Sequence, residues 1–288
     1  MNILIIKTGA SGDVVRTTCL LTKLKGNIWW VTKKENIPLL PSFVNVIDIK
    51  YATVEIKNSH FDVVLSLDDE PNSATLVNHV SYDILIGSYV SNGKVKYTDS
   101  CSSWFDMGLI SRLGIEKSNY LKKTNTHCYQ YHLFRSLGLK FDGEEYQITI
   151  PRHKKVNNLI SIETRCGERW PTKQWNKFDE LAIRLKNDGY EVRFLHQREN
   201  MLDYVKDIAE SRYLFCGDSL SLHLALATKT KTFAIFTCTP PNEIYDYGLV
   251  EKIFSSDIYD YLYIKEYCAD VVNKITCDHV YDKFKTIK

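Results

Sequence analysis

The sequence predicts an α/β protein built from two Rossmann-like, doubly wound domains that face each other across a cleft. Short apolar runs rich in β-branched residues alternate with segments of helical periodicity, which is typical of a parallel sheet covered by helices on both faces. The alternation stops over residues 88–127 and starts again at residue 158. The polar stretch 153–158 between the two alternating halves predicts separate domains at 1–155 and 156–288.

The first half opens with a continuous apolar run at 3–6, as expected for a strand that is buried on both faces. Apolar residues then recur at helical spacing from Val14 to Leu24, which predicts a helix. Further strands are expected at 27–32, 44–49, 61–67 and 83–87, and further helices at 36–40, 72–80, near 105–113 and at 129–137. Pro41 and Gly138 are suitable residues to end two of these helices.

The second half repeats the pattern of strand and helix, which is why a second domain of similar build is expected. Strands are predicted at 158–162, 190–195, 213–216 and 232–236, and helices at 178–187, 201–209 and 221–228. Gly189 follows the first of these helices as a C-terminal glycine. An amphipathic helix over 278–285 is expected to end the chain.

The composition excludes several classes of protein. Of the 288 residues, 44% are hydrophobic and 25% are charged, and the net charge is only +2, so no overall field attracts nucleic acid. No apolar run reaches the roughly 20 residues of a membrane span, and no signal-peptide pattern is present, so a cytoplasmic protein is expected. None of the eight cysteines forms a Cys-x-x-Cys pair, which predicts reduced thiols and argues against a structural metal.

A glycine-containing turn joins the first strand to the first helix, and Asp13 lies where that helix begins. The Asp13 carboxylate can either cap the helix or lie above the strand ends and accept a proton. Because Gly9 and Gly12 do not follow the Gly-x-Gly-x-x-Gly spacing, the turn is only a weak match to a dinucleotide-binding loop.

Two segments of the second half have residues that suit a diphosphate. Arg165, Arg169 and Lys173 lie in a loop between a strand and a helix, where α/β domains place ligand contacts. Asp218 and Ser219 precede the helix at 221–228, whose first backbone N–H groups can hold phosphate. His223, one turn into that helix, is expected to be mainly a packed core residue.

These segments carry a resemblance to a known family. The stretches ILIIKTGASGDVVRTT at 3–18, RWPTKQW at 169–175, GDSLSLHLA at 217–225 and FAIFTCTPP at 233–241 resemble family 9 of the two-Rossmann-domain (GT-B) glycosyltransferases, the heptosyltransferase-like enzymes. The similarity runs through most of the chain in the same order. The chain differs from the family in having Leu220 where glycine is usual, and in a short segment between Leu195 and Tyr213, so it resembles a compact variant.

The resemblance implies an inverting glycosyltransferase that uses neither a metal ion nor a cofactor. Asp13 would be the general base, with Lys7, Gly12 and Arg16 on the acceptor side. The donor site would comprise Arg165, Arg169, Lys173, Asp218, Ser219, Leu220 and His223. The expected donor is a nucleotide-diphosphate sugar, with ADP-heptose favoured, and the expected acceptor is a glycan or a lipid-linked glycan of lipopolysaccharide biosynthesis. Work at the inner face of the inner membrane, by peripheral association, is a further expectation from the family.

Two other functions remain open from the residues. A non-catalytic protein that binds sugar nucleotides is compatible with Leu220 and with the short second domain. An NAD(P)-dependent oxidoreductase is suggested by the strand–glycine–helix opening, but the glycine spacing and Asp13 argue against it. The balance favours Asp13 as an acceptor-side base, with the phosphates bound by the second half of the chain.

Overall fold

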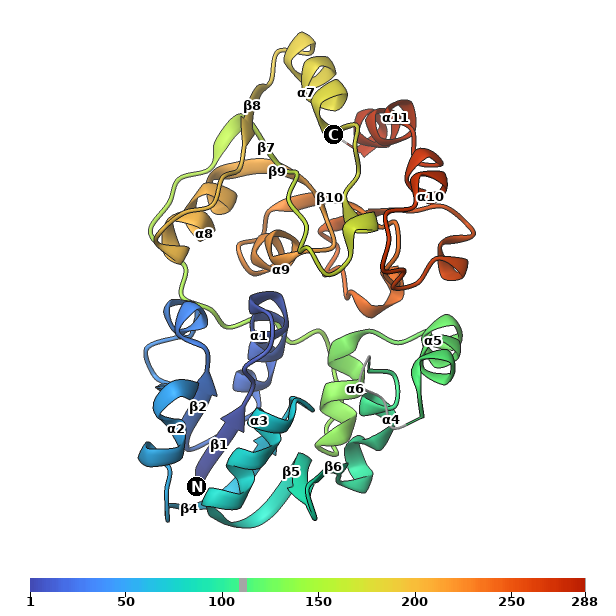
Figure 1. The fold of residues 1–288 in the computed structure, drawn as a ribbon. Helices are drawn as coiled ribbons and strands as arrows, with labels where there is room; N and C mark the ends of the chain where they lie inside the picture. The colour runs from blue at the N-terminus through green and yellow to red at the C-terminus, as the bar shows by residue number, and fades with distance from the viewer. Residues whose placement is uncertain (109–112, 288) are drawn as a thin grey trace. The chain divides into compact units, whose positions relative to one another are not determined.

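The computed structural model describes residues 1–108 and 113–287, which form two compact units, Met1–Thr149 and Ile150–Lys288 (Figure 1). The units divide between Thr149 and Ile150, a few residues before the boundary expected at 155. Each unit contains its own α/β sheet.

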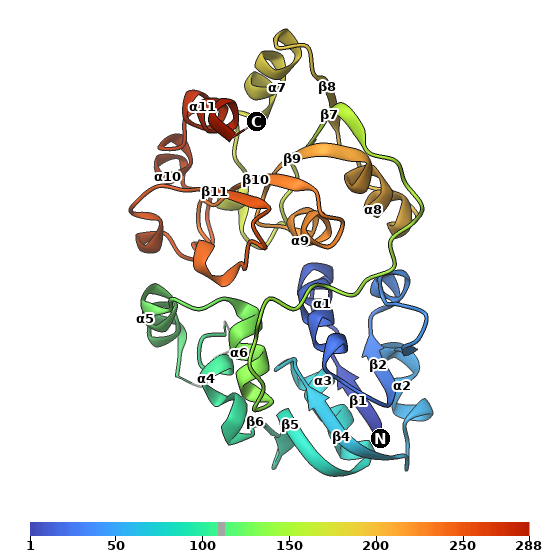
Figure 2. The same ribbon diagram turned by 180° about the vertical axis from the view of Figure 1, so that it is seen from behind.

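A six-stranded sheet forms the centre of the described N-terminal unit, in the order β3-β2-β1-β4-β5-β6 (Figures 1 and 2). Its strands are β1 (Asn2–Ile6), β2 (Asn27–Thr32), β3 (Asn45–Asp48), β4 (His60–Ser66), β5 (Ser81–Ser91) and β6 (Lys94–Tyr97). All neighbouring strands are parallel except β5 and β6, which pair as an antiparallel hairpin. The five strands expected from the sequence are confirmed, whereas β6 lies in the segment 88–127 that had no expected strand.

The helices of the N-terminal unit are shorter than the sequence predicts. They are α1 (Ser11–Thr17), α2 (Ile49–Glu55), α3 (Pro71–Ala74), α4 (Ser102–Phe105), α5 (Ile115–Thr124) and α6 (Tyr129–Ser136), with 3₁₀ turns at Thr18–Thr22, Lys34–Leu39, Thr75–His79 and Asp99–Cys101. The expected helix near 105–113 extends over residues 109–112, which lie outside the described residues. Gly138 has a φ of 70° after α6, so its predicted role as a C-terminal glycine is confirmed.

Threonine hydroxyls explain why the helix expected from Val14 to Leu24 changes at Thr17 into a 3₁₀ turn. The hydroxyl of Thr18 donates to the carbonyl of Val15, and that of Thr22 donates to the carbonyl of Cys19. Such side-chain bonds to the preceding turn compete with regular α-helical pairing. The apolar periodicity is therefore right about which face is buried, and wrong about the type of helix.

One face of the N-terminal sheet packs on α2 and the turn Thr75–His79. The core on this face contains Leu4, Ile6, Val31, Ile47, Ala52, Ile56, Phe61, Val64, Leu76 and Val77. Because side chains alternate along a strand, Ile3 and Ile5 point to the other face, and they too are fully buried. Burial on both faces accounts for the continuous apolar run of β1.

The C-terminal unit contains a five-stranded parallel sheet in the order β11-β10-β9-β7-β8. Its strands are β7 (Val156–Glu163), β8 (Glu191–Phe194), β9 (Ser211–Gly217), β10 (Lys231–Ile235) and β11 (Val250–Ile253). Its helices are α7 (Phe178–Asn187), α8 (Met201–Glu210), α9 (Leu220–Ala227), α10 (Ala269–Asn273) and α11 (Cys277–Ile287), with 3₁₀ turns at Pro171–Lys173, Pro241–Glu243 and Ile258–Asp260. All strands and helices expected in this half are confirmed; β11 and α10, which are short, were not predicted.

Helices α7, α10 and α11 cover one face of the C-terminal sheet, and their apolar side chains form its core with Phe215 and Phe233 of the strands. Helices α8 and α9 contact each other and strands β7, β9 and β10. Residues Ser221–Ala227 of α9 are all buried, so this helix has no exposed face. The start of α9 is consequently held rigidly beside the end of β9.

Both sheets reverse their strand order at one point. In the N-terminal unit β1 lies between β2 and β4, and in the C-terminal unit β7 lies between β8 and β9. In open α/β sheets, ligands bind beyond the carboxyl ends of the strands at such a reversal. The loops that follow β1, β4, β7 and β9 are therefore the places to look for a site.

All eight cysteines lie in the described residues and are present as thiols; five of them are buried. Among the described helices, none combines the length and the apolar character that crossing a membrane requires.

Candidate functional site

The turn after β1 is wrapped around the carboxylate of Asp68, which follows β4. The Lys7 Nζ donates to Asp68 Oδ1 at 2.6 Å and to the carbonyl of Leu67 at 3.1 Å. The backbone N–H groups of Thr8 and Gly9 both donate to Asp68 Oδ2. A Cβ at Gly9 would lie 3.3 Å from Asp68 Oδ1, so a side chain here would crowd the carboxylate.

Lys7 is a buried structural cation in this arrangement. Burial opposes its charge, but Asp68, together with Tyr129 and Asp13, outweighs that effect and holds the pKa of Lys7 above its usual range. Lys7 thus fixes the turn that carries the expected acceptor-side residues. Asp68 was not among the residues expected from the sequence, although its place directly after a strand was a usable signal.

This network bears on the dinucleotide alternative. In a dinucleotide-binding loop the backbone N–H groups of the turn face a phosphate. Here the N–H groups of Thr8 and Gly9 donate to the Asp68 carboxylate, which takes the place that the phosphate has in such a loop. The turn after β1 is therefore poorly suited to bind a pyrophosphate.

Replacing Asp68 with asparagine should destabilise the N-terminal unit by about 3–5 kcal/mol, because it leaves Lys7 as an unpaired buried charge. The free energy of unfolding in urea would measure the loss. Glu70→Gln is the matched control, since Glu70 is an exposed carboxylate of the same loop whose side chain makes no capping hydrogen bond to α3. Equal stability of the Asp68→Asn variant and the wild type would contradict the structural role of Asp68.

Asp13 lies in the first turn of α1, but it does not cap that helix. The N-cap is Ala10, whose carbonyl accepts from the Asp13 N–H at 2.8 Å, so the capping alternative is wrong. The Asp13 side chain is 37% exposed, and Arg16 NH2 lies 2.6 Å from its Oδ1. Gly12 precedes it and is partly exposed. A carboxylate that is ion-paired on one oxygen and still reaches solvent can accept a proton.

In the C-terminal unit, Lys173 and Asp218 are brought together by the neighbouring strands β7 and β9. The Lys173 Nζ donates to Asp218 Oδ2 at 3.1 Å and to the Asp218 carbonyl at 2.9 Å. A Cβ at Gly217 would lie 3.3 Å from the carbonyl of Lys173, so a small residue there lets the two loops approach closely. A third Lys173 hydrogen remains to donate to a ligand.

The Asp218 carboxylate is kept charged. Its burial disfavours the charge, but Lys173 and His223 outweigh the burial and hold the pKa of Asp218 well below its usual range. His223 is itself buried in α9, which agrees with its expected place in the core, and it also contributes positive potential to this cluster. These three expected donor-site residues therefore form one electrostatic unit.

The N-terminus of α9 completes this cluster. Ser219 is the N-cap, but its side chain makes no capping hydrogen bond; its hydroxyl lies 2.8 Å from that of Ser221. Leu220 is the first helical residue and is partly exposed. The α-helix thus presents backbone N–H groups and the positive end of its dipole next to Lys173.

The two arginines expected at the donor site differ in their surroundings. Arg165 is bound by Glu163, with Nε 2.9 Å from Oε1 and NH2 2.5 Å from Oε2, and Glu163 also accepts a hydrogen bond from the Tyr204 hydroxyl. Arg169 is exposed, and its guanidinium lies over the ring of Trp170 at 5.4 Å. Among the described residues no ion pair involves Arg169, which makes it the more available cation of the two. Glu163 and Tyr204 were missed by sequence reasoning because they are far apart in the chain.

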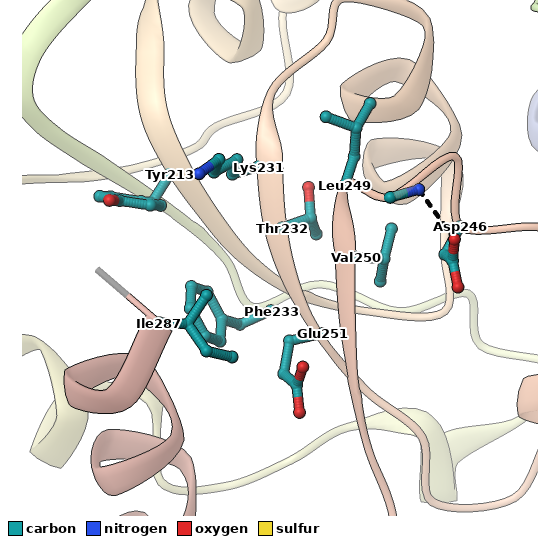
Figure 3. Close-up of a pocket in the computed structure, with 10 residues that line it drawn as sticks. Tyr213, Lys231, Thr232, Phe233, Asp246, Leu249, Val250, Glu251 and Ile287 are labelled. Carbon is teal, nitrogen blue, oxygen red and sulfur yellow. Dashed lines mark hydrogen bonds between the residues drawn. The ribbon is translucent and has the colours of Figure 1, made fainter.

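Other candidate features lie away from these loops. Within residues 1–108 and 113–287, one group of side chains could hold a metal ion: His60, Asp62 and Asp83. Their ligand atoms lie within 4.8 Å of one another, on the exposed surface of β4 and β5. A cavity of about 210 Å³ opens near the first residues of β10 and β11. Lys231, Asp246 and Glu251 line it, together with Ile287 of α11 (Figure 3). This is the amino edge of the sheet, opposite the loops that carry Lys173 and Asp218.

The structure of this chain resembles solved structures, whereas its sequence has no match among known proteins. No family model and no curated protein matches the sequence. Escherichia coli heptosyltransferase WaaC with ADP-2-deoxy-2-fluoro heptose superposes with a TM-score of 0.66 at 15% identity, covering 100% of both chains. The glycosyl transferase family 9 structure from Veillonella parvula has a TM-score of 0.70 at 15% identity, covering 99% of this chain and 96% of the other.

The chain has the GT-B fold of the heptosyltransferases. Escherichia coli ADP-heptose LPS heptosyltransferase II is a further neighbour, with a TM-score of 0.57 at 13% identity and coverage of 99% and 98%. The iron-containing, dodecameric heptosyltransferase TibC is also similar, with a TM-score of 0.58, and this chain covers 75% of it. The expected fold class is thereby confirmed across the whole length of the chain.

Proposed function

We propose that this protein is an inverting glycosyltransferase that moves a heptose-like sugar from an ADP-sugar to a glycan or lipid-linked acceptor. The observation that carries the proposal is the partly buried Lys173–Asp218 pair beside the start of α9, at the strand reversal of a heptosyltransferase-like fold. Asp13 lies at the corresponding reversal of the other sheet. Each position is one where α/β sheets bind ligands.

In this mechanism Asp13 acts as the general base. Its carboxylate accepts the proton of an acceptor hydroxyl while the hydroxyl oxygen forms a bond to the anomeric carbon. The bond between that carbon and the β-phosphate oxygen breaks, and ADP leaves from the opposite face, so the anomeric centre inverts. Arg16 beside Asp13 favours the charged carboxylate that the reaction needs at its start.

Positive groups of the C-terminal unit would stabilise the departing diphosphate. Lys173 and Arg169 supply cations, and the N–H groups at the start of α9 supply oriented dipoles. The lysine is already fixed by Asp218, so little reorganisation is needed when negative charge develops. These groups support a reaction without a metal ion, which predicts that turnover persists in EDTA.

The proposal also names a donor and an acceptor. ADP and an ADP-heptose analogue are the ligands named for the WaaC structures, which supports ADP as the nucleotide here. A glycan of lipopolysaccharide biosynthesis, reached at the inner membrane surface from the cytoplasm, is the acceptor that fits this class. Leu220 and the internal pairing of Arg165 favour a second candidate, a protein that binds the sugar nucleotide without transferring it.

A thermal-shift series with ADP, UDP, GDP and CDP tests the proposal. A ligand at 100 times its Kd stabilises the native state by about 2.7 kcal/mol, so ADP should raise Tm and the other nucleotides should raise it less. Lys231→Met, at the opposite edge of the sheet, is the matched control and should show the same ADP shift. If no nucleotide shifts Tm, the proposal is overturned. If the protein binds ADP-heptose but releases no ADP with any of a panel of acceptors, the second candidate, a non-catalytic binding protein, is favoured.

A further inference from the structure

We propose that Tyr129 is a positioning residue that holds Asp13 in place through Arg16. The inference rests on the proposed function, because it assigns Asp13 its role as base. Tyr129 lies on α6, far from α1 in the sequence, and no feature of the sequence pointed to it. The argument follows from two contacts that link the Tyr129 side chain to α1, and from a third that holds its ring against Trp104 of α4.

The first contact is between the Tyr129 ring and Arg16. The guanidinium carbon of Arg16 lies 3.6 Å from the ring centroid, which is direct stacking contact. The same guanidinium places NH2 2.6 Å from Asp13 Oδ1. Arg16 therefore lies between the ring and the carboxylate, and its side chain is only 17% exposed. A stacked guanidinium loses little further freedom when it binds the carboxylate.

The second contact is between the Tyr129 hydroxyl and Thr17, whose oxygens are 2.8 Å apart. The Thr17 hydroxyl donates its hydrogen to the Asp13 carbonyl at 2.7 Å, so the Tyr129 hydroxyl is the donor to Thr17. Tyr129 consequently restrains residue 13 in two ways. Arg16 orients the side chain of Asp13, and Thr17 fixes its backbone.

The third contact keeps Tyr129 itself in place. The Trp104 ring meets the Tyr129 ring edge-on, with centroids 4.1 Å apart. The phenol is 5% exposed, and burial raises its pKa, so it remains a neutral donor even with the positive charges of Lys7 and Arg16 nearby. The packed rings of Trp104 and Tyr129 thus support the Arg16–Asp13 pair.

The consequence for catalysis is geometric. A general base must stay within hydrogen-bond reach of the proton that it accepts, and a displacement of about 1 Å can cost roughly 100-fold in rate. Arg16 was expected to lie on the acceptor side of the site. Its stacking and ion pair instead indicate that it orients the base, so its loss should reduce kcat while the donor KM changes little.

Tyr129→Leu and Tyr129→Phe separate the roles of ring and hydroxyl. Tyr129→Leu removes both contacts and should lower kcat about 10- to 100-fold with an unchanged donor KM. Tyr129→Phe retains the stacking and should recover most of the rate. Tyr131→Leu is the matched control on the same helix, because Tyr131 stacks on His127 and not on Arg16, and it should behave like the wild type.

A second measurement does not depend on turnover. The rotation of the Arg16 guanidinium can be followed in ¹⁵N spectra, with its signal assigned by its loss in an Arg16→Lys sample. The guanidinium should rotate slowly in the wild type and in Tyr129→Phe, and rapidly in Tyr129→Leu. Wild-type kcat in a folded Tyr129→Leu variant, or a guanidinium equally restrained in it, would overturn the inference. A wild-type protein that transfers no sugar but shows the expected guanidinium behaviour would refute the proposed function and leave the positioning of Asp13 by Tyr129 intact.

Discussion

Asp13→Asn should lower the rate of ADP release from the donor by about 10²–10⁴-fold, the range that general base catalysis contributes. The amide has the same shape and still offers an oxygen to Arg16, but it cannot accept the proton of the acceptor hydroxyl. The Tm shift with ADP should be unchanged, because the nucleotide is proposed to bind the C-terminal unit. Initial rates of ADP formation and a thermal-shift titration measure the two quantities on one preparation.

Asp83→Asn is a suitable control for this experiment. Asp83 lies on β5 of the same sheet, near its amino edge, and its side chain is 61% exposed. The control should match the wild type in rate and in Tm. An Asp13→Asn variant that retains its rate within about threefold would remove Asp13 as the base, since far more is expected from losing a general base.

Lys173→Met should have the largest combined effect on stability and binding. It leaves the partly buried Asp218 carboxylate without its cation, which is expected to destabilise the C-terminal unit by about 1–3 kcal/mol. Weaker ADP binding should accompany this, because a charge-assisted contact to phosphate is lost. Urea unfolding and calorimetric titration with ADP measure the two losses.

The double variant Lys173→Met/Asp218→Leu separates these two effects. Removing both charges leaves no unpaired ion, so stability should recover while ADP binding stays weak. Lys283→Met is the control, because its exposed pair with Glu251 should contribute less than about 1 kcal/mol. If ADP binds the double variant as tightly as the wild type, the pair is structural and the phosphates bind elsewhere.

The same pair predicts a dependence of stability on pH. The pKa of Asp218 is lower in the folded protein than in the unfolded chain, so the unfolded chain takes up the proton first as the pH falls. The stability that Asp218 contributes is present above its ordinary pKa of about 4, and is lost progressively below that value. Asp218→Leu, combined with Lys173→Met, should make unfolding less sensitive to acid than it is in the wild type.

The alternation of apolar runs was sufficient to predict the α/β class, because it depends on burial patterns that each segment carries by itself. β1 is buried on both faces and reads as an uninterrupted run, and α7 has the predicted bounds of 178–187 because its apolar stripe and Gly189 are local signals. The first helix was predicted too long because hydroxyl bonds of Thr18 and Thr22 to the backbone alter helix type without changing the apolar period.

The placement of candidate residues after strands was also predictable. Asp218 directly follows β9, Asp13 lies in the first turn of the helix after β1, and Lys173 lies in the loop after β7; parallel strands bring their carboxyl ends to one edge of a sheet. What the sequence did not indicate is which loops become neighbours. Strand order is decided by packing between segments far apart in the chain, and no local pattern encodes it.

The sequence by itself determined the class of fold, the strand ends that carry polar residues, and the likeness to heptosyltransferases on which the expected base depends. Only the tertiary structure decided that β1 lies beside β4, so that Asp68 organises the first turn, and that α6 brings Tyr129 against Arg16. The physical reason is that a side chain's hydrogen bonds, charge and burial depend on its spatial neighbours. Those neighbours are set by the packing of whole strands and helices.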